Sequence, residues 1–311
     1  MQIKRKLLLV ICAAALTITG SGAATASASE AGVAGWVTDK LNTFHDATGR
    51  VTVSVFWTEG GDARSHWDET IYPSDPDMLA IGGGAVASNQ GYGSLLTKSR
   101  PTDDMSGWSV AAKDHQAASP FKLKAYVIGL KIAGMSKDQL RHDQNVINRS
   151  NISGVASHPE AEVGVPSEQY EMVGGGFEVI SHGWGSMATA SFPSSQFTWK
   201  ARSKDHLHSD PAQIRTWAIG IKRDLPVGRI DAAYDDNGSS TSAHPASTAE
   251  PPVGYALTGG GGEVHYSGAG NMLWALQPAT GNSSSFTAAS KDHIVSDPTS
   301  ITAYAWGIRF I

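Results

Sequence analysis

One pattern occurs three times between residues 51 and 311. Its clearest element is the tripeptide Lys-Asp-His, found at residues 113–115, 204–206 and 291–293. Each tripeptide follows the start of a Gly-Gly-Gly run, at residues 82–84, 174–176 and 259–261, by 31, 30 and 32 positions respectively. An aromatic residue lies five positions before each lysine, and a proline lies five positions after each histidine. Self-similarity at a fixed period indicates repeated structural units, so the repeat constrains the fold more than any single motif does.

The repeats occupy residues 51–134, 145–223 and 228–311. Within each repeat, apolar runs are bounded by Gly, Pro, Asn and Ser, which is typical of β-strands. Four main strands are expected per repeat: a glycine strand, a second strand, the strand that ends in Lys-Asp-His, and a final strand. The connections between repeats are short and not of low complexity, which favours one body over tethered units. The sequence therefore predicts an all-β single domain with pseudo-threefold symmetry and about twelve main strands.

Twelve strands in three four-stranded sheets would match the layout of a β-prism, by strand count alone. The Gly-Gly-Gly runs are followed by strand-like segments, whereas a phosphate loop is followed by Lys-Ser/Thr and a helix. Glycine inside a strand permits a close approach of another backbone. We therefore expect the three glycine strands to meet near a common axis, with a flat floor for a sugar ring as the alternative.

The N-terminus has the pattern of a secretory signal at residues 1–28. A basic start precedes the apolar run Leu7–Ile18, and Ala26-Ser27-Ala28 resembles a cleavage site. The apolar run is too short for a membrane span, and it contains Cys12, the only cysteine. We expect a secreted mature chain without cysteine and without a membrane span. Residues 29–50 form either a short helix or a partly ordered leader.

Charge argues against two classes of partner. Removing the three basic residues of the signal leaves 21 Lys+Arg against 29 Asp+Glu, a net charge of −8. An acidic chain is disfavoured as a binder of nucleic acid or of anionic membranes. No motif in the sequence implies a cofactor.

The Lys-Asp-His strands carry the first candidate site. Side chains alternate between faces along a strand, so the aspartate shares a face with the preceding aromatic residue, and the lysine and histidine share the other. One interpretation is that each aspartate accepts backbone N–H groups of the following turn, while lysine and histidine lie at the surface. The other is that the Asp-His pairs line a ligand site. The candidate residues are Asp114, His115, Asp205, His206, Asp292 and His293.

The sequence also contains two sets of three histidines that are candidates for a metal site. His66, His158 and His244 recur in the long loops, and form one threefold set beside that of the tripeptides. Either set, if it converged on the axis, would resemble a three-histidine zinc site. No close ligand pair such as His-x-His recurs in all repeats, so we assign no metal ligands, and the loop histidines are expected to bend their loops.

Two aromatic residues in glycine-rich hairpin tips decide the functional expectation. Tyr92 lies in Gln90–Gly93 and Trp184 lies in Ser181–Gly185. An exposed aromatic ring beside polar side chains is what carbohydrate binding uses. We therefore expect a secreted, non-catalytic, lectin-like module with up to three weak sites for an extracellular glycan or cell-wall polysaccharide. A folded-back tip would explain the same residues.

Two other functions remain open. A secreted hydrolase would need one asymmetric acid/His site, and no nucleophile recurs at a fixed place in the repeats, so no catalytic residue is assigned. A structural or inhibitor-like extracellular protein would need no small ligand.

Overall fold

The computed structural model describes residues 38–181, 183–279 and 283–311 as a nearly all-β single domain with three sheets and one short helix, α1 (Lys137–His142). The predicted signal, with Cys12, lies outside the described residues. In order across the first sheet, the strands are β1 (Asp39–His45), β2 (Val51–Glu59), β7 (Lys124–Ile132), β4 (Leu79–Val86), β18 (Met272–Pro278), β19 (Phe286–Lys291) and β16 (Ala246–Ala249).

The second sheet has the order β3 (His66–Ile71), β6 (Trp108–Asp114), β5 (Ser94–Pro101), β10 (Tyr170–Ile180), β13 (Gln213–Lys222) and β8 (Val146–Ile152). The third has the order β14 (Asp224–Leu225), β15 (Gly228–Gly238), β20 (Ile301–Phe310), β17 (Ala256–Val264), β11 (Ser186–Ser195), β12 (Thr198–Asp205) and β9 (Glu160–Gly164). Each sheet thus combines strands from two of the three segments 51–134, 145–223 and 228–311. Strands from different segments meet at β4–β18, β5–β10 and β11–β17.

The Gly-Gly-Gly runs lie where backbones from different segments approach closely. A Cβ atom on Gly259 would lie 3.2 Å from Cα of Gly174, and one on Gly82 would lie 3.3 Å from Cα of Gly259. The third glycine of each run faces a carbonyl oxygen of the neighbouring segment. The middle glycine of each run is covered by the buried aromatic ring that precedes the lysine, in the pairs Gly83–Trp108, Gly175–Trp199 and Gly260–Phe286. A Cβ atom on the middle or third glycine of each run would lie within 2.5 Å of a neighbouring atom, so these positions leave no room for a side chain.

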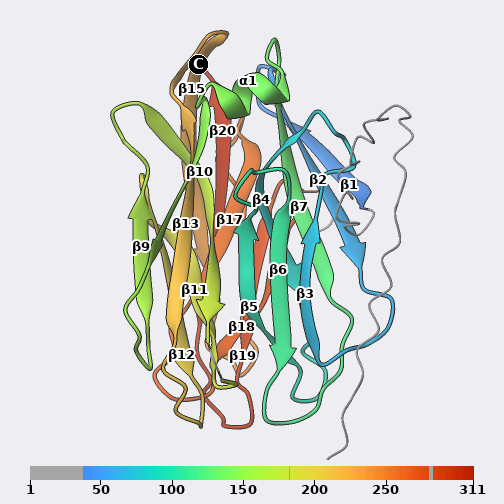
Figure 1. Ribbon diagram of the computed structural model, residues 1–311, viewed down its shortest axis with the longest axis vertical. Helices are drawn as coiled ribbons and strands as arrows, with labels where there is room; N and C mark the ends of the chain where they lie inside the picture. The colour runs from blue at the N-terminus through green and yellow to red at the C-terminus, as the bar shows by residue number, and fades with distance from the viewer. Residues whose placement is uncertain (1–37, 182, 280–282) are drawn as a thin grey trace, which may run out of the picture. The chain divides into compact units, whose positions relative to one another are not determined.

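The three strands that carry Lys-Asp-His end on the same side of the domain. In Figure 1, β12, β19 and the arrowhead of β6 lie toward the bottom, and α1 lies at the opposite end. Helix α1 begins with a capping box in which Ser136 and Gln139 bond to each other's main chain. The loops around the ends of β6, β12 and β19 therefore gather at one end of the domain, away from the helix.

The structure differs from the expected secondary structure in two ways. It contains strands beyond the four main ones expected per repeat, because segments of the long polar loops also pair at sheet edges, as β3, β9 and β16 do. The described part of the leader forms strand β1, paired with β2, in place of a helix. Leu41 and Phe44 in β1 belong to the helical pattern, but pairing with an open sheet edge overrides a local propensity. Among the described residues, no helix is long and apolar enough to cross a membrane.

Candidate functional site

The three histidines of the tripeptides meet at the end of the domain. The ring centroids of His115, His206 and His293 lie 5.1, 5.4 and 5.6 Å apart in pairs, and each side chain is at most 2% exposed. His115 donates from Nε2 to the carbonyl oxygen of His206 at 3.1 Å, and His293 donates from Nε2 to that of His115 at 2.7 Å. The surface position expected for these histidines is therefore wrong, because loops of neighbouring segments cover the end of each strand.

Each histidine is followed by a tight turn. The N–H two positions after the histidine donates to the histidine carbonyl, at 2.7 Å for Ala117 and His208 and 2.6 Å for Val295. The central residues Gln116, Leu207 and Ile294 have φ of 59°, 60° and 63°. These are γ-turns with positive φ, which are rare and strained, most of all for a β-branched residue such as Ile294. The turns aim the histidine carbonyls into the cluster, where two of them accept the ring N–H groups.

Burial controls the protonation of this cluster. It lowers the pKa of His206 to about 3, helped by the neighbouring His115 and His293. Burial also lowers the pKa of His115 and His293. For His293, two carbonyl oxygens oppose the shift: Nδ1 lies 2.8 Å from the oxygen of Tyr92, and Nε2 lies 2.7 Å from that of His115. At neutral pH the cluster is therefore largely uncharged.

The three lysines of the tripeptides differ in burial and in hydrogen bonding. Lys204 and Lys291 are each 1% exposed, and each donates from Nζ to a carbonyl oxygen in the hairpin tip of another segment. Burial lowers the pKa of Lys204 to about 8 and that of Lys291 to about 7. Lys113 is half-buried, and its side chain makes no hydrogen bond or ion pair with any described residue. The expectation that these lysines lie at the surface is wrong for Lys204 and Lys291.

The aspartates brace the turns, as the first interpretation expected. Each accepts a bond from the main-chain N–H five positions later: Ser119 to Asp114 at 2.9 Å, Asp210 to Asp205 at 3.3 Å, and Asp297 to Asp292 at 3.4 Å. The side chains of Asp205 and Asp292 are 16% exposed. In each of the three bonds the acceptor is Oδ2, so this structural role does not use Oδ1.

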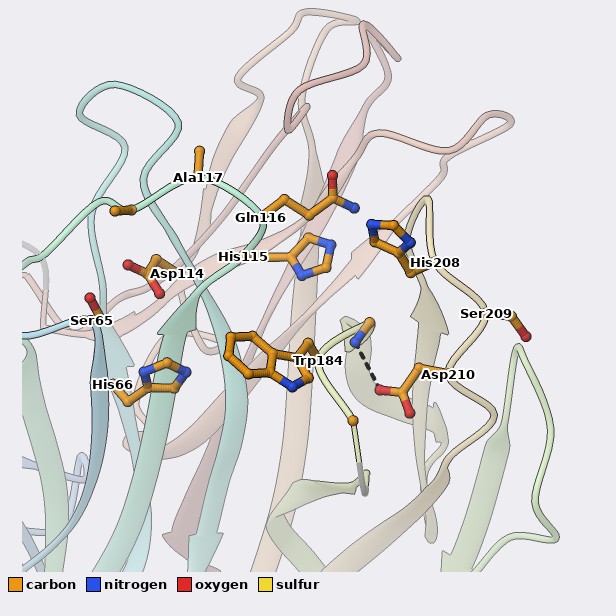
Figure 2. Close-up of a pocket in the computed structure, with 13 residues that line it drawn as sticks. Ser65, His66, Asp114, His115, Gln116, Ala117, Trp184, His208, Ser209 and Asp210 are labelled. Carbon is orange, nitrogen blue, oxygen red and sulfur yellow. Dashed lines mark hydrogen bonds between the residues drawn. The ribbon is translucent and has the colours of Figure 1, made fainter.

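A cleft of about 680 Å³, called the main cleft below, opens beside the histidine cluster. Its lining comes from residues 65–66, 114–118, 183–185 and 208–210. Figure 2 shows the indole of Trp184 between His66 and Asp210, below His115. Trp184 is 76% exposed although it lines the cleft. Asp210 holds the Trp184 tip in place by accepting the main-chain N–H groups of Gly185 and Ser186, at 2.8 and 3.2 Å.

In the corresponding places of the other segments, the loop histidine lies within ion-pair distance of the tripeptide aspartate. His158 pairs with Asp205 at 3.7 Å, and the ring of Tyr266 lies against the His158 ring and 3.8 Å from Nζ of Lys204. His244 pairs with Asp292 at 3.4 Å. No such pair joins His66 and Asp114 in the described structure, although both line the main cleft. The main cleft therefore differs from the other two places in that its loop histidine, His66, is not within ion-pair distance of its aspartate, Asp114.

The sequence-predicted residues fall into two groups. His115, His206 and His293 come together in the cluster, and Asp114, His115 and Trp184 line the main cleft. Tyr92, 56% exposed, lies near the ring of His293 and does not line the main cleft. Sequence reasoning missed Asp210, Asp297 and Ser119 as supports of the tips, although all three lie four positions after a tripeptide histidine. That fixed spacing was the available signal.

No known family model matches this chain, and no curated protein is significantly similar to it. Across residues 38–181, 183–279 and 283–311, no group of three or more His, Cys, Asp or Glu side chains is arranged to hold a metal ion.

Proposed function

We propose that the protein is a secreted carbohydrate-binding module and that the main cleft is its principal site. The observation that carries the proposal is Trp184, whose indole is 76% exposed inside a lined cleft. A large aromatic side chain that remains in water forgoes roughly 1.5–3 kcal/mol of burial. Sugar rings present apolar C–H faces that pack on such a ring, so a bound glycan would recover this free energy.

The polar groups around the indole suit the hydroxyls of a sugar. Oδ1 of Asp114 accepts no bond from a described residue, and the ring of His66 also lies in the cleft without such a partner. Ser65 and Gln116 add a hydroxyl and an amide to the lining. Small-ligand sites combine an apolar surface with a few fixed polar groups, and this cleft offers both.

The three related places are expected to bind a glycan with unequal affinity. The equivalents of the cleft beside Asp205 and Asp292 have their polar groups paired internally, so we assign the strongest binding to the main cleft and weaker binding to the Tyr92 tip. A pseudo-threefold, prism-like relation among the three segments would account for three related but unequal places. Strands shared between segments and the meeting of the glycine runs support this relation.

A glycan array tests the proposal. The mature protein, residues 29–311, is expected to bind at least one glycan class, and Trp184→Ala should weaken that binding at least about tenfold with an unchanged melting temperature. Tyr92→Ala should weaken it less. Val253→Ala is the matched control, because Val253 is 99% exposed outside the cleft. Absence of any glycan binding, or equal binding by the Trp184 variant, would refute the proposal.

A second candidate, a secreted hydrolase, is favoured by the asymmetry of the three described places, since only at the main cleft do the loop histidine and the aspartate lie outside ion-pair distance of each other. Incubating the protein with the glycans that it binds, and measuring new reducing ends, separates the two functions. Release of reducing ends that is lost in Asp114→Asn would assign the hydrolase.

A further inference from the structure

We propose that the main cleft is specific for an acidic carbohydrate, whose carboxylate or sulfate group pairs with Lys113; this inference rests on the proposed function. A hollow of about 270 Å³ adjoins the main cleft and shares His66, Asp114, Gly183 and Trp184 with it. Lys113 lines this side hollow and does not line the main cleft itself. A sugar ring on Trp184 would thus have its substituents within reach of the Lys113 ammonium.

Lys113 can be compared with the equivalent lysines of the other two repeats. The two equivalent lysines have carbonyl partners, Lys204 with Gly268 at 3.0 Å and Lys291 with Ser88 at 2.5 Å. Lys113 has no such partner among the described residues, although it stands at the same position of its repeat. A half-buried ammonium group without a partner is unfavourable, and burial lowers the pKa of Lys113 accordingly. An anionic ligand would supply the missing partner.

The acids near Lys113 do not fill this role. Asp210, which acts on the pKa of Lys113, accepts the main-chain N–H groups of Gly185 and Ser186. Asp114 accepts the N–H of Ser119, and neither acid forms an ion pair with Lys113. In the proposed complex, Oδ1 of Asp114 accepts hydrogen bonds from sugar hydroxyls, and the ammonium group of Lys113 pairs with the anionic group. A partly desolvated charge pair of this kind gives specificity as well as affinity.

The experiment compares charged and neutralised forms of the same oligosaccharides by isothermal titration. The probes are pentamers of galacturonate and mannuronate with their carboxyl-reduced forms, and a sulfated carrageenan oligosaccharide with its desulfated form. At least one acidic probe is expected to bind about tenfold or more tightly than its neutral form. The uronate and carrageenan arms show whether carboxylate or sulfate is preferred.

Substitutions of Lys113 test whether this residue causes the preference for the acidic form. Lys113→Met should bring the ratio of acidic-form to neutral-form affinity close to one, whereas Lys113→Arg should retain the preference. Lys122→Met is the control for net charge, because Lys122 is exposed and lines neither hollow. Melting temperatures confirm that each variant is folded.

Equal binding of acidic and neutral forms, or a preference that survives in Lys113→Met, would overturn the inference. If only neutral array glycans bind, and bind through Trp184, the inference fails while the proposed function stands. If the array shows no glycan at all, the proposed function itself fails.

Discussion

Lys291 donates from its ammonium nitrogen to the main-chain carbonyl oxygen of Ser88, 2.5 Å away and 203 positions earlier in the chain. The ammonium group packs against Gly93, where a Cβ atom would overlap it. Among the described residues it forms no ion pair with a carboxylate. Because a buried charge without a counter-charge is costly, the pKa of Lys291 falls from 10.5 to about 7. This contact joins the first and third segments. The lowered pKa makes the free energy of unfolding depend on pH above about 7.

The first prediction concerns that sensitivity. Between pH 7 and 10.5, the unfolded chain holds a proton on Lys291 that the folded chain has released, so the free energy of unfolding rises with pH. The slope is at most about 1.4 kcal/mol per pH unit for one group. Lys204, with a pKa of about 8, adds to it from pH 8 upward. Urea unfolding between pH 7 and 9.5 measures the slope.

Lys291→Met should reduce this slope and leave the protein at least as stable at pH 7. The carbonyl oxygen of Ser88 remains satisfied in the variant, because it also accepts the main-chain N–H of Ser94 at 2.9 Å. An alkaline slope as large in the variant as in the parent would contradict the prediction.

Acid should act through the histidine cluster. The folded pKa of His206 is about 3 against an ordinary 6.5, so the unfolded chain takes up a proton in this window that the folded chain refuses. Stability should therefore fall as pH drops below 6.5, by up to about 1.4 kcal/mol per pH unit and group. His115, His293 and Lys204 surround this ring, and protonating any of them opposes its protonation further. Thermal unfolding between pH 7 and 5.5 keeps most carboxylates ionised while the histidines of the unfolded chain titrate.

His206→Leu should weaken this acid dependence, because leucine removes the titrating group from a site where both ring nitrogens lack a hydrogen-bond partner. The exposed His45 offers a control, and His45→Gln should leave the profile unchanged. Parallel acid profiles for the parent and the His206 variant would show that the cluster is not responsible.

Asp297 is the most heavily used carboxylate at the hairpin tips. It is 6% exposed and accepts the main-chain N–H groups of Gly268, Gly270 and Asn271 at 3.1 to 3.3 Å. Asp297→Ala should lower the free energy of unfolding by roughly 2–4 kcal/mol, because buried donors lose a charged acceptor. Chemical denaturation measures this change.

Serine should repair part of the loss at this position. Ser119 holds the equivalent place in the first segment, where its hydroxyl accepts the N–H of Gly93 at 3.0 Å. Asp297→Ser is therefore expected to be more stable than Asp297→Ala. Asp62→Ala, at an exposed position, should change stability by less than about 0.5 kcal/mol. Equal stability of the alanine and serine variants would show that the acceptor is unimportant.

The β class of the fold could be predicted from sequence because the repeats carry strand-length apolar runs at a fixed period. Which strands pair could not. Each sheet combines strands from two segments, as where β10 pairs with β5, and a repeat pattern contains no information about which copy supplies the neighbour. Strand β1 was missed for a related reason, since Leu41 and Phe44 fit a helical pattern as well as a strand at a sheet edge.

Three residues that line the main cleft, Asp114, His115 and Trp184, were predicted from the sequence, whereas Asp210 and the arrangement of the site were not. Alternation along β12 holds from Trp199 to Ser203, where the aromatic face is the core. It fails at Lys204 and His206, because the tip of another segment covers the face that alternation assigns to solvent. Exposure depends on what lies above a strand, which local periodicity does not record. The openness of the main cleft likewise depends on contacts that only the folded chain brings together.

The last prediction concerns the C-terminal strand β20, which matches an inner strand in each repeat. It pairs with β15 on one side and with β17 on the other, so it is an inner strand of the third sheet. Deleting residues 306–311 would remove the buried side chains of Trp306, Ile308 and Phe310. Each contributes roughly 1.5–3 kcal/mol, and the deletion also leaves two strands without a partner along half their length. The loss approaches a typical stability of about 5–15 kcal/mol, so the truncated protein should be insoluble or unfolded. Deleting Ile311 alone, which is 64% exposed, is the control and should preserve a cooperative thermal transition near that of the parent. A soluble 306–311 deletion with an unchanged melting temperature would mean that β20 does not complete the third sheet, and the shared-strand architecture would have to be abandoned at its final element.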